Sequence, residues 1–131
     1  MKRLWLLMLS ALMIPAFANA GETKIMYYQS KIPGPQITKD YYVKESLKRE
    51  NPKNPNLLQV KRISIVTSPE GTTTYRMTTR INCETRQSAM IAYWSTGSTE
   101  AQQRAMADGK WRSIDDFDDT PLLAKKICPK K

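Results

Sequence analysis

The clearest hydrophobic pattern in this chain is a strict alternation over residues 72–83. One face carries Tyr75, Met77, Thr79, Ile81 and Cys83, and the other carries Thr74, Arg76, Thr78, Arg80 and Asn82. A period of two is typical of a β-strand with one buried face. Residues 58–66 also alternate, with a change of phase at Arg62 and Ile63 that predicts a β-bulge. Since a Ser-Pro-Glu-Gly turn signal at 68–71 separates the two runs, we expect a β-hairpin over residues 57–83.

Other segments predict further strands on either side of this hairpin. Residues 24–30 and 41–43 are rich in apolar and aromatic side chains, and Pro-Gly-Pro at 33–35 separates them. Residues 86–95 are apolar on both faces, which favours a central position in the sheet. The charged segment 44–50 fits a helical turn or a loop. Residues 51–56 hold two prolines and three asparagines, and they are predicted to form a mobile loop.

Two segments follow residue 98, and the sequence leaves the first, residues 99–108, undecided between helix and strand. Residues 100–107 have strong helix propensity, yet a hairpin partner for 86–95 is topologically expected at the same place, and both alternatives stay open. Near the end, Asp119 or Thr120 can cap a helix whose first turn holds Pro121. Leu122, Leu123 and Ile127 give that helix an apolar side, and Pro129 ends it. Lys125 and Lys126 near its C-terminal end complement the helix dipole.

The first twenty residues have the three parts of a secretory signal peptide. Lys2 and Arg3 precede an apolar run over residues 4–17, and Ala-Asn-Ala at 18–20 predicts cleavage between Ala20 and Gly21. An apolar run of roughly 14 residues is shorter than the ~20 that a spanning helix needs, which argues against a membrane anchor. No cysteine lies near the cleavage point to accept a lipid. We expect a soluble product, in the periplasm or secreted, with residues 21–131 as a single domain.

Both cysteines, Cys83 and Cys128, lie in the mature part of the chain. An even count in an oxidising compartment points to a disulfide, and two cysteines allow only one pairing. A redox pair usually has a closer spacing such as C-x-x-C. The expected structural disulfide fastens the C-terminal helix to the strand that ends at Cys83.

The composition removes most catalytic classes. The chain has no histidine, which excludes Ser-His-Asp and Cys-His triads, and its five glycines form no phosphate-binding loop. Four carboxylates at Asp115, Asp116, Asp118 and Asp119 match no calcium-binding spacing and instead suit a helix N-terminus. We therefore predict no catalytic residue, no cofactor and no metal site. Trp111 and Tyr93 are expected in the core, because a domain this small needs their buried area.

The net charge suggests the kind of partner. The formal charge is +9, and it becomes +7 when Lys2 and Arg3 leave with the signal. An excess of this size fits an anionic partner such as lipopolysaccharide, an acidic glycan or a membrane surface, and it equally fits a charge that only maintains solubility. Nucleic acid would suit the charge, but the export signal argues against it.

The order of motifs in the C-terminal half resembles a known family. Residues 81–86, Ile-Asn-Cys-Glu-Thr-Arg, are followed by an apolar strand to Tyr93, by Gly97, by Trp-Arg-Ser-Ile at 111–114 and by a short helix ending at Cys128. With Tyr-Val-Lys-Glu-Ser-Leu at 42–47, where Lys44 replaces a usual aspartate, this order is similar to the surface-adhesin protein E-like domains of Gram-negative bacteria. The resemblance implies an antiparallel sheet with a C-terminal helix, and a strand over residues 99–106.

These observations together predict an α+β fold with one disulfide: an antiparallel sheet of about five or six strands with one C-terminal helix packed on it. The predicted function is non-catalytic binding of a protein or an anionic ligand in the envelope. The resemblance implies an adhesin, whose partners would be host extracellular matrix or serum proteins. The alternative is a periplasmic inhibitor or accessory protein of the cell envelope.

Overall fold

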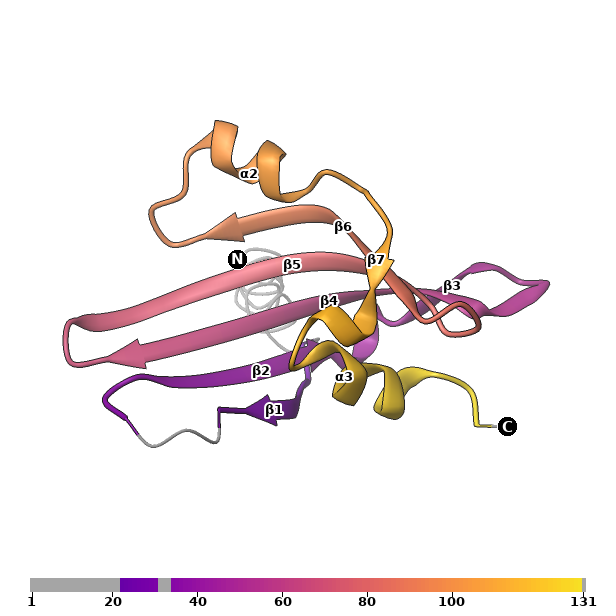
Figure 1. The fold of residues 1–131 in the computed structure, drawn as a ribbon, viewed down its shortest axis with the longest axis horizontal. Coiled ribbons are helices and arrows are strands. Elements are labelled where there is room, and N and C mark those ends of the chain that lie inside the picture. The colour runs from indigo at the N-terminus through magenta and orange to yellow at the C-terminus, as the bar shows by residue number, and fades with distance from the viewer. Residues whose placement is uncertain (1–21, 31–33, 131) are drawn as a thin grey trace, which may run out of the picture.

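The protein forms one curved antiparallel sheet with two α-helices (Figure 1). The computed structural model describes residues 22–30 and 34–130. Seven strands follow the order β1-β2-β4-β5-β6-β7, and β3 pairs with β4. The elements are β1 (Lys24–Gln29), β2 (Ile37–Val43), the 3-10 turn η1 (Lys44–Ser46), β3 (Lys48–Asn51), β4 (Asn54–Ser68), β5 (Gly71–Asn82), β6 (Gln87–Ser95), α2 (Glu100–Met106), β7 (Arg112–Ser113), the 3-10 turn η2 (Ile114–Asp116) and α3 (Thr120–Ile127).

The predicted hairpin is confirmed as the long pair β4–β5. Its register runs without a shift from Leu57 opposite Asn82 to Ser68 opposite Gly71, so the bulge expected at Arg62 and Ile63 is wrong. The apolar phase changes there because neighbouring side chains on opposite faces of β4 are both buried: Arg62 is 7% exposed and Ile63 is 2% exposed. Shifts in register occur instead at β1 between Met26 and Tyr28, and in the β5–β6 pairing beside Thr78.

The asparagine- and proline-rich segment 51–56 belongs to two strands joined by a turn at residues 52–53, so its prediction as a loop without regular structure is wrong. Asn51 ends β3 and Asn54 begins β4. The Asn51 side chain accepts the backbone N–H of Lys53 at 3.0 Å, and Asn54 accepts that of Asn56 at 3.0 Å. These local hydrogen bonds close the turn. The preceding segment 44–50 forms η1 and β3, and β2 and β3 pair with successive parts of β4.

The core lies between the sheet and α3, as predicted. Thr120, Leu123, Ala124 and Ile127 are the buried residues of α3, at the spacing of one helical face. Leu123 and Ile127 pack against Leu58, Val60 and Ile81 of the central strands and against Tyr27 and Tyr42. We call this side of the sheet the covered face and the opposite side the open face. Because side chains alternate along a strand, the odd-numbered residues of β4 lie on the open face.

The strand implied for residues 99–106 is wrong, because this segment forms α2. Thr99 caps the helix through a reciprocal capping box with Gln102, with bonds of 3.2 and 2.9 Å. The hairpin partner of β6 is therefore reduced to the two residues of β7, which pair with Gln87 and Ser88. Beyond Ser88, β6 is an edge strand rather than a central one, and α2 packs along it (Figure 1). Among the described residues, no helix is long and apolar enough to cross a membrane.

Candidate functional site

The open face of the sheet gathers most of the basic residues that lie in strands. The register places six cations on it, from five strands: Lys24, Lys39, Lys48, Lys61, Arg76 and Arg80. Five of them are exposed, and Arg80 is half-buried. Among the described strand residues, Glu50 is the one carboxylate that reaches this face, because Asp40 lies on the covered face. The strands therefore give this face a positive excess.

Apolar side chains lie between these cations. Met26, Tyr41, Ile63, Arg76 and Trp94 are consecutive register partners and form one row across five strands. The two ends of the row, Met26 and Trp94, are 45% and 44% exposed. Large exposed apolar side chains grouped on one surface usually indicate an interaction site. The open face thus combines positive charge with apolar and aromatic contact area.

A shallow groove of about 270 Å³ lies in the middle of this face. Its lining residues include the apolar Val43, Ile63, Ala92 and Trp94, the cations Lys61, Arg62 and Arg76, and the carboxylate Glu22. Arg76 is 3.7 Å from Glu22, with both side chains about half exposed, so this ion pair contributes little. Within the part of the chain that the structure describes, Lys61 has no carboxylate within 4.0 Å.

Among the six cations, Arg80 has its charge balanced by a closely paired carboxylate. Its Nε and Nη2 donate to the two carboxylate oxygens of Glu50 at 2.7 and 2.8 Å, and this pairing raises the pKa of the guanidinium. The guanidinium lies 4.9 Å from the ring centroid of Trp111, a cation–π contact. Trp111 is 38% exposed, so its predicted place in the core is wrong. Tyr93 is half-buried rather than a core residue.

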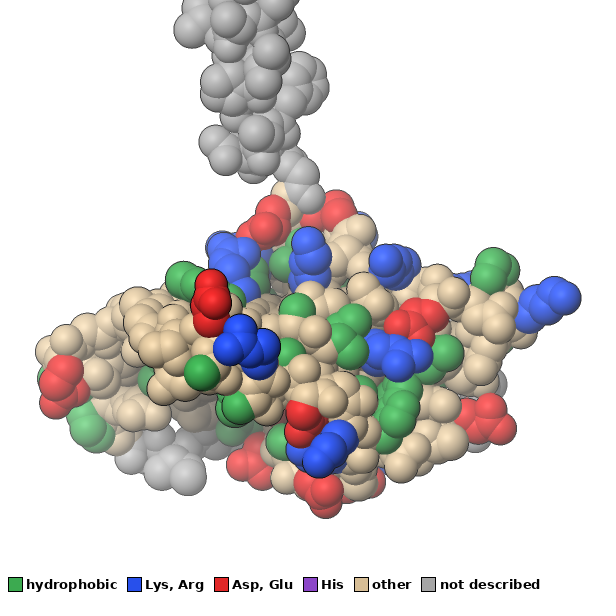
Figure 2. Space-filling model, turned by 90° about the horizontal axis from the view of Figure 1, so that it is seen from above, with side chains coloured by type: hydrophobic (Ala, Val, Ile, Leu, Met, Phe, Trp, Pro, Cys, Tyr) green, Lys and Arg blue, Asp and Glu red, His purple; other side chains and the backbone are tan. Residues whose placement is uncertain are grey.

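The edge formed by β6 and α2 differs from the open face in its balance of charge. In Figure 2, which looks onto the molecule from above, blue and red side chains lie interspersed. Two ion pairs account for part of this mixture, Arg104 with Glu100 at 3.8 Å and Arg112 with Asp108 at 2.7 Å. Pairing with Arg112 also lowers the pKa of Asp108 to about 2. These two pairs balance four of the charges at this edge.

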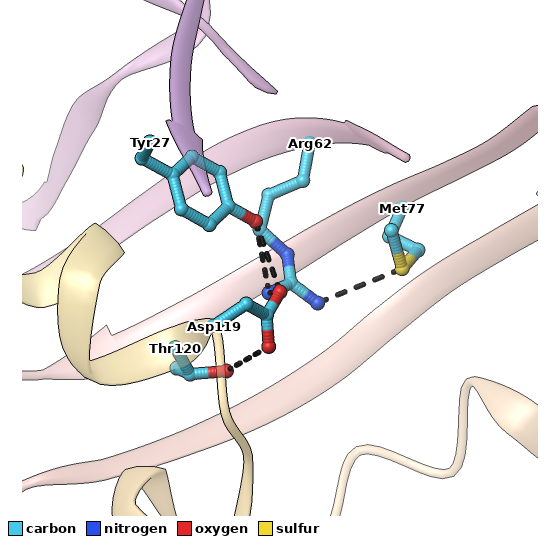
Figure 3. A network of polar contacts seen from close by, with 5 residues as sticks. All are labelled: Tyr27, Arg62, Met77, Asp119 and Thr120. Carbon is cyan, nitrogen blue, oxygen red and sulfur yellow. Dashed lines mark hydrogen bonds and ion pairs between the residues drawn. The ribbon is translucent and has the colours of Figure 1, made fainter. Parts of the chain in front are cut away.

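The covered face holds a buried polar network beside the apolar core (Figure 3). Arg62 Nη1 lies 3.4 Å from the Tyr27 hydroxyl and 3.5 Å from Asp119 Oδ2, and the same oxygen accepts the Tyr27 hydroxyl at 3.3 Å. Burial raises the pKa of Tyr27 above its ordinary range. Burial also raises the pKa of Asp40 to about 6, and the neighbouring Asp119 carboxylate adds to this. Arg62 of β4 therefore contacts β1 through Tyr27, β5 through Met77 and the start of α3 through Asp119.

Two of the four carboxylates before α3, Asp115 and Asp119, have partners close by. Asp115 accepts Arg86 at 2.8 Å, and Asp119 is the N-cap residue of α3. The Asp119 side chain does not cap that helix, because its carboxylate is directed to Arg62 and Tyr27. Among the described residues, no group of three or more Cys, Asp or Glu side chains is placed to hold a metal ion.

The predicted disulfide is present between Cys83 and Cys128, whose Cα atoms are 5.8 Å apart. It joins the end of β5 to the residue after α3. The predicted cleavage residues Ala20 and Gly21 lie outside the described residues. The network at Arg62 was missed by the sequence analysis. The sequence feature that points to this network is the alternation of Leu58, Val60 and Arg62, which places an arginine on the face that α3 covers.

Comparisons of this chain with protein-family models, with curated proteins and with solved structures found no match.

Proposed function

We propose that this chain is an exported, non-catalytic binding protein of the cell envelope that holds an acidic glycan on the open face of its sheet. The observation that carries the proposal is the distribution of charge in the strands. Six cations lie on the open face, and Glu50 is the one described strand carboxylate that reaches it. Opposite charge attracts and orients a polyanion on such a surface.

The layout of these cations favours an extended ligand over a small anion. Neighbouring strands are about 4.8 Å apart and three such spacings separate β1 from β5, so the cations spread across about 14 Å of the sheet instead of converging on one point. Tyr41 and Trp94 add flat ring surfaces in the same area. A chain of acidic sugars offers repeated negative charges together with apolar ring faces, and it matches both features.

Export is supported by the sequence and by the disulfide. The signal-like segment 1–20 and a bridge that closes a long loop suit an oxidising compartment. The resemblance to surface-adhesin protein E-like domains supports a binding role in the envelope. Expression of the full chain in a Gram-negative host should yield a periplasmic or secreted product that begins at Gly21, as N-terminal sequencing would show. A product that retains Met1 in the cytoplasm would contradict the proposal.

The glycan site can be tested with heparin as an acidic-glycan probe. The mature, disulfide-bonded protein should bind it saturably, and Lys61→Gln with Arg76→Gln should weaken binding about fivefold, since each exposed ionic contact contributes roughly 0.5 kcal/mol. Raising the salt concentration should weaken binding further. The matched control is Lys125→Gln with Lys126→Gln, which removes the same charge from exposed positions on α3. Equal weakening in both variants would show an effect of net charge alone and would contradict the site.

A further inference from the structure

Among the described residues that line the groove of the open face, Glu22 is the one carboxylate. Its Oε1 lies 3.7 Å from Arg76 Nη1. The backbone next to Glu22 is fixed at the end of β2, because the Thr23 N–H donates to the Glu45 side chain and the Thr23 carbonyl accepts the Lys44 N–H at 2.9 Å. The chain therefore keeps Glu22 beside Arg76, directly before β1 begins.

The contact between Glu22 and Arg76 is weak enough to be exchanged for another. The two side chains are 44% and 51% exposed, and exposed ion pairs are screened by water and salt. Within the part of the chain that the structure describes, neither side chain makes another ion pair. A carboxylate from a ligand can therefore replace Glu22 on Arg76 at little cost, since one anion is exchanged for another.

The neighbour of Arg76 across the sheet offers a flat surface for a ring. Arg76 and Trp94 are register partners in β5 and β6, so their Cβ atoms lie about 5 Å apart on the open face. Trp94 is largely exposed and lines the same groove. Lys61 lies diagonally across from Arg76 in the β4–β5 ladder, within reach of an anion bound there. The groove thus places an aromatic ring beside two cations.

Building on the proposed glycan-binding function, we infer that this groove binds a hexuronic acid unit, whose carboxylate displaces Glu22 from Arg76 while its sugar ring packs on Trp94. In a hexuronic acid the carboxylate is attached directly to a ring carbon, so acid and ring are adjacent, as Arg76 and Trp94 are. A carboxylate also has the charge and shape of the Glu22 group that already occupies this position. Glu22 is thus an internal competitor that lowers the affinity of the groove for anions.

Oligogalacturonate, a chain of uronic acids without sulfate, tests this inference. Titrated into the mature, disulfide-bonded protein, it should bind saturably and shift the indole N–H NMR signal of Trp94. Glu22→Gln should tighten the binding about threefold, because it removes the competing charge beside Arg76. Glu84→Gln serves as the control, since it removes the same charge from the turn after β5, roughly 20 Å from Arg76, and it should keep the wild-type affinity.

The ring contact is tested with oligo-glutamate of matched charge, which has carboxylates but no sugar rings. Trp94→Ala should weaken the binding of oligogalacturonate at least about fivefold and that of oligo-glutamate less than about twofold. Equal weakening of the two ligands, or no weakening of either, would overturn the role of Trp94. Equal affinities of Glu22→Gln and Glu84→Gln for oligogalacturonate would overturn the displacement of Glu22.

Failure of this inference is distinguishable from failure of the proposed function. If heparin binds and Lys61→Gln with Arg76→Gln weakens it, whereas oligogalacturonate does not bind, the open face remains an acidic-glycan site and the hexuronic acid preference is overturned. If neither heparin nor oligogalacturonate binds saturably, both the glycan site and its preference are overturned.

Discussion

Removal of the disulfide should cost this domain a large part of its stability. The bridge between Cys83 and Cys128 spans a sequence separation of 45 residues, and the closed loop contains β6, α2, β7 and α3. The chain-entropy relation gives a loop of this length about 13 cal/mol/K, or about 4 kcal/mol at 25 °C. Stabilities of small domains are ~5–15 kcal/mol, so the variant Cys83→Ala with Cys128→Ala should remain folded but be much less stable.

The assay is urea unfolding followed by circular dichroism, together with a thermal melt. For about 110 residues, each kcal/mol shifts the melting temperature by ~4 °C, so the expected fall is about 15 °C. Hydrogen exchange should also show that α3 loses protection first, because the bridge is its covalent link to β5. A loss of less than about 1 kcal/mol, with α3 still protected, would refute the reasoning, since the loop would then be ordered without the bridge.

Two further predictions concern the covered face. Leu123→Ala should lower the free energy of unfolding by about 2–5 kcal/mol in urea titrations, because this side chain is 0% exposed. Its neighbour Leu122 is 39% exposed and provides the matched control. An equal loss in Leu122→Ala would contradict the packing of α3. Burial raises the pKa of Asp40 from 3.8 to about 6, so the folded state holds this proton more tightly and stability should fall as pH rises from about 4 to 6. Asp40→Asn should flatten that fall in urea titrations at pH 4, 5, 6 and 7, and an unchanged pH profile would contradict it.

The sequence by itself determined the elements whose signals are local. The alternation in residues 72–83 and the turn at 68–71 are enough to specify the β4–β5 hairpin, because each strand pairs with its immediate neighbour. The capping residues and the apolar Leu123 and Ile127 predict α3 and most of the face that it buries, although Leu122, expected on the same side, is 39% exposed. The two cysteines of the sequence allow only one bridge. In each case the signal comes from residues that are close together in the sequence, or only one pairing is possible.

The tertiary structure decided the features that depend on which surfaces meet. Arg62 and Ile63 are adjacent and both buried, although their side chains lie on opposite faces of β4. Arg62 contacts Tyr27 and Asp119 on the covered face, and Ile63 lies between Tyr41 and Arg76 in the row across the open face. The sequence alone made this pair resemble a bulge. Tryptophan is a residue type that a small core often needs, but Trp111 is exposed and forms a cation–π contact with Arg80. The six cations of the open face are far apart in the sequence, and only the strand register places them together. Burial and register arise from contacts between distant segments, and no local pattern contains that information.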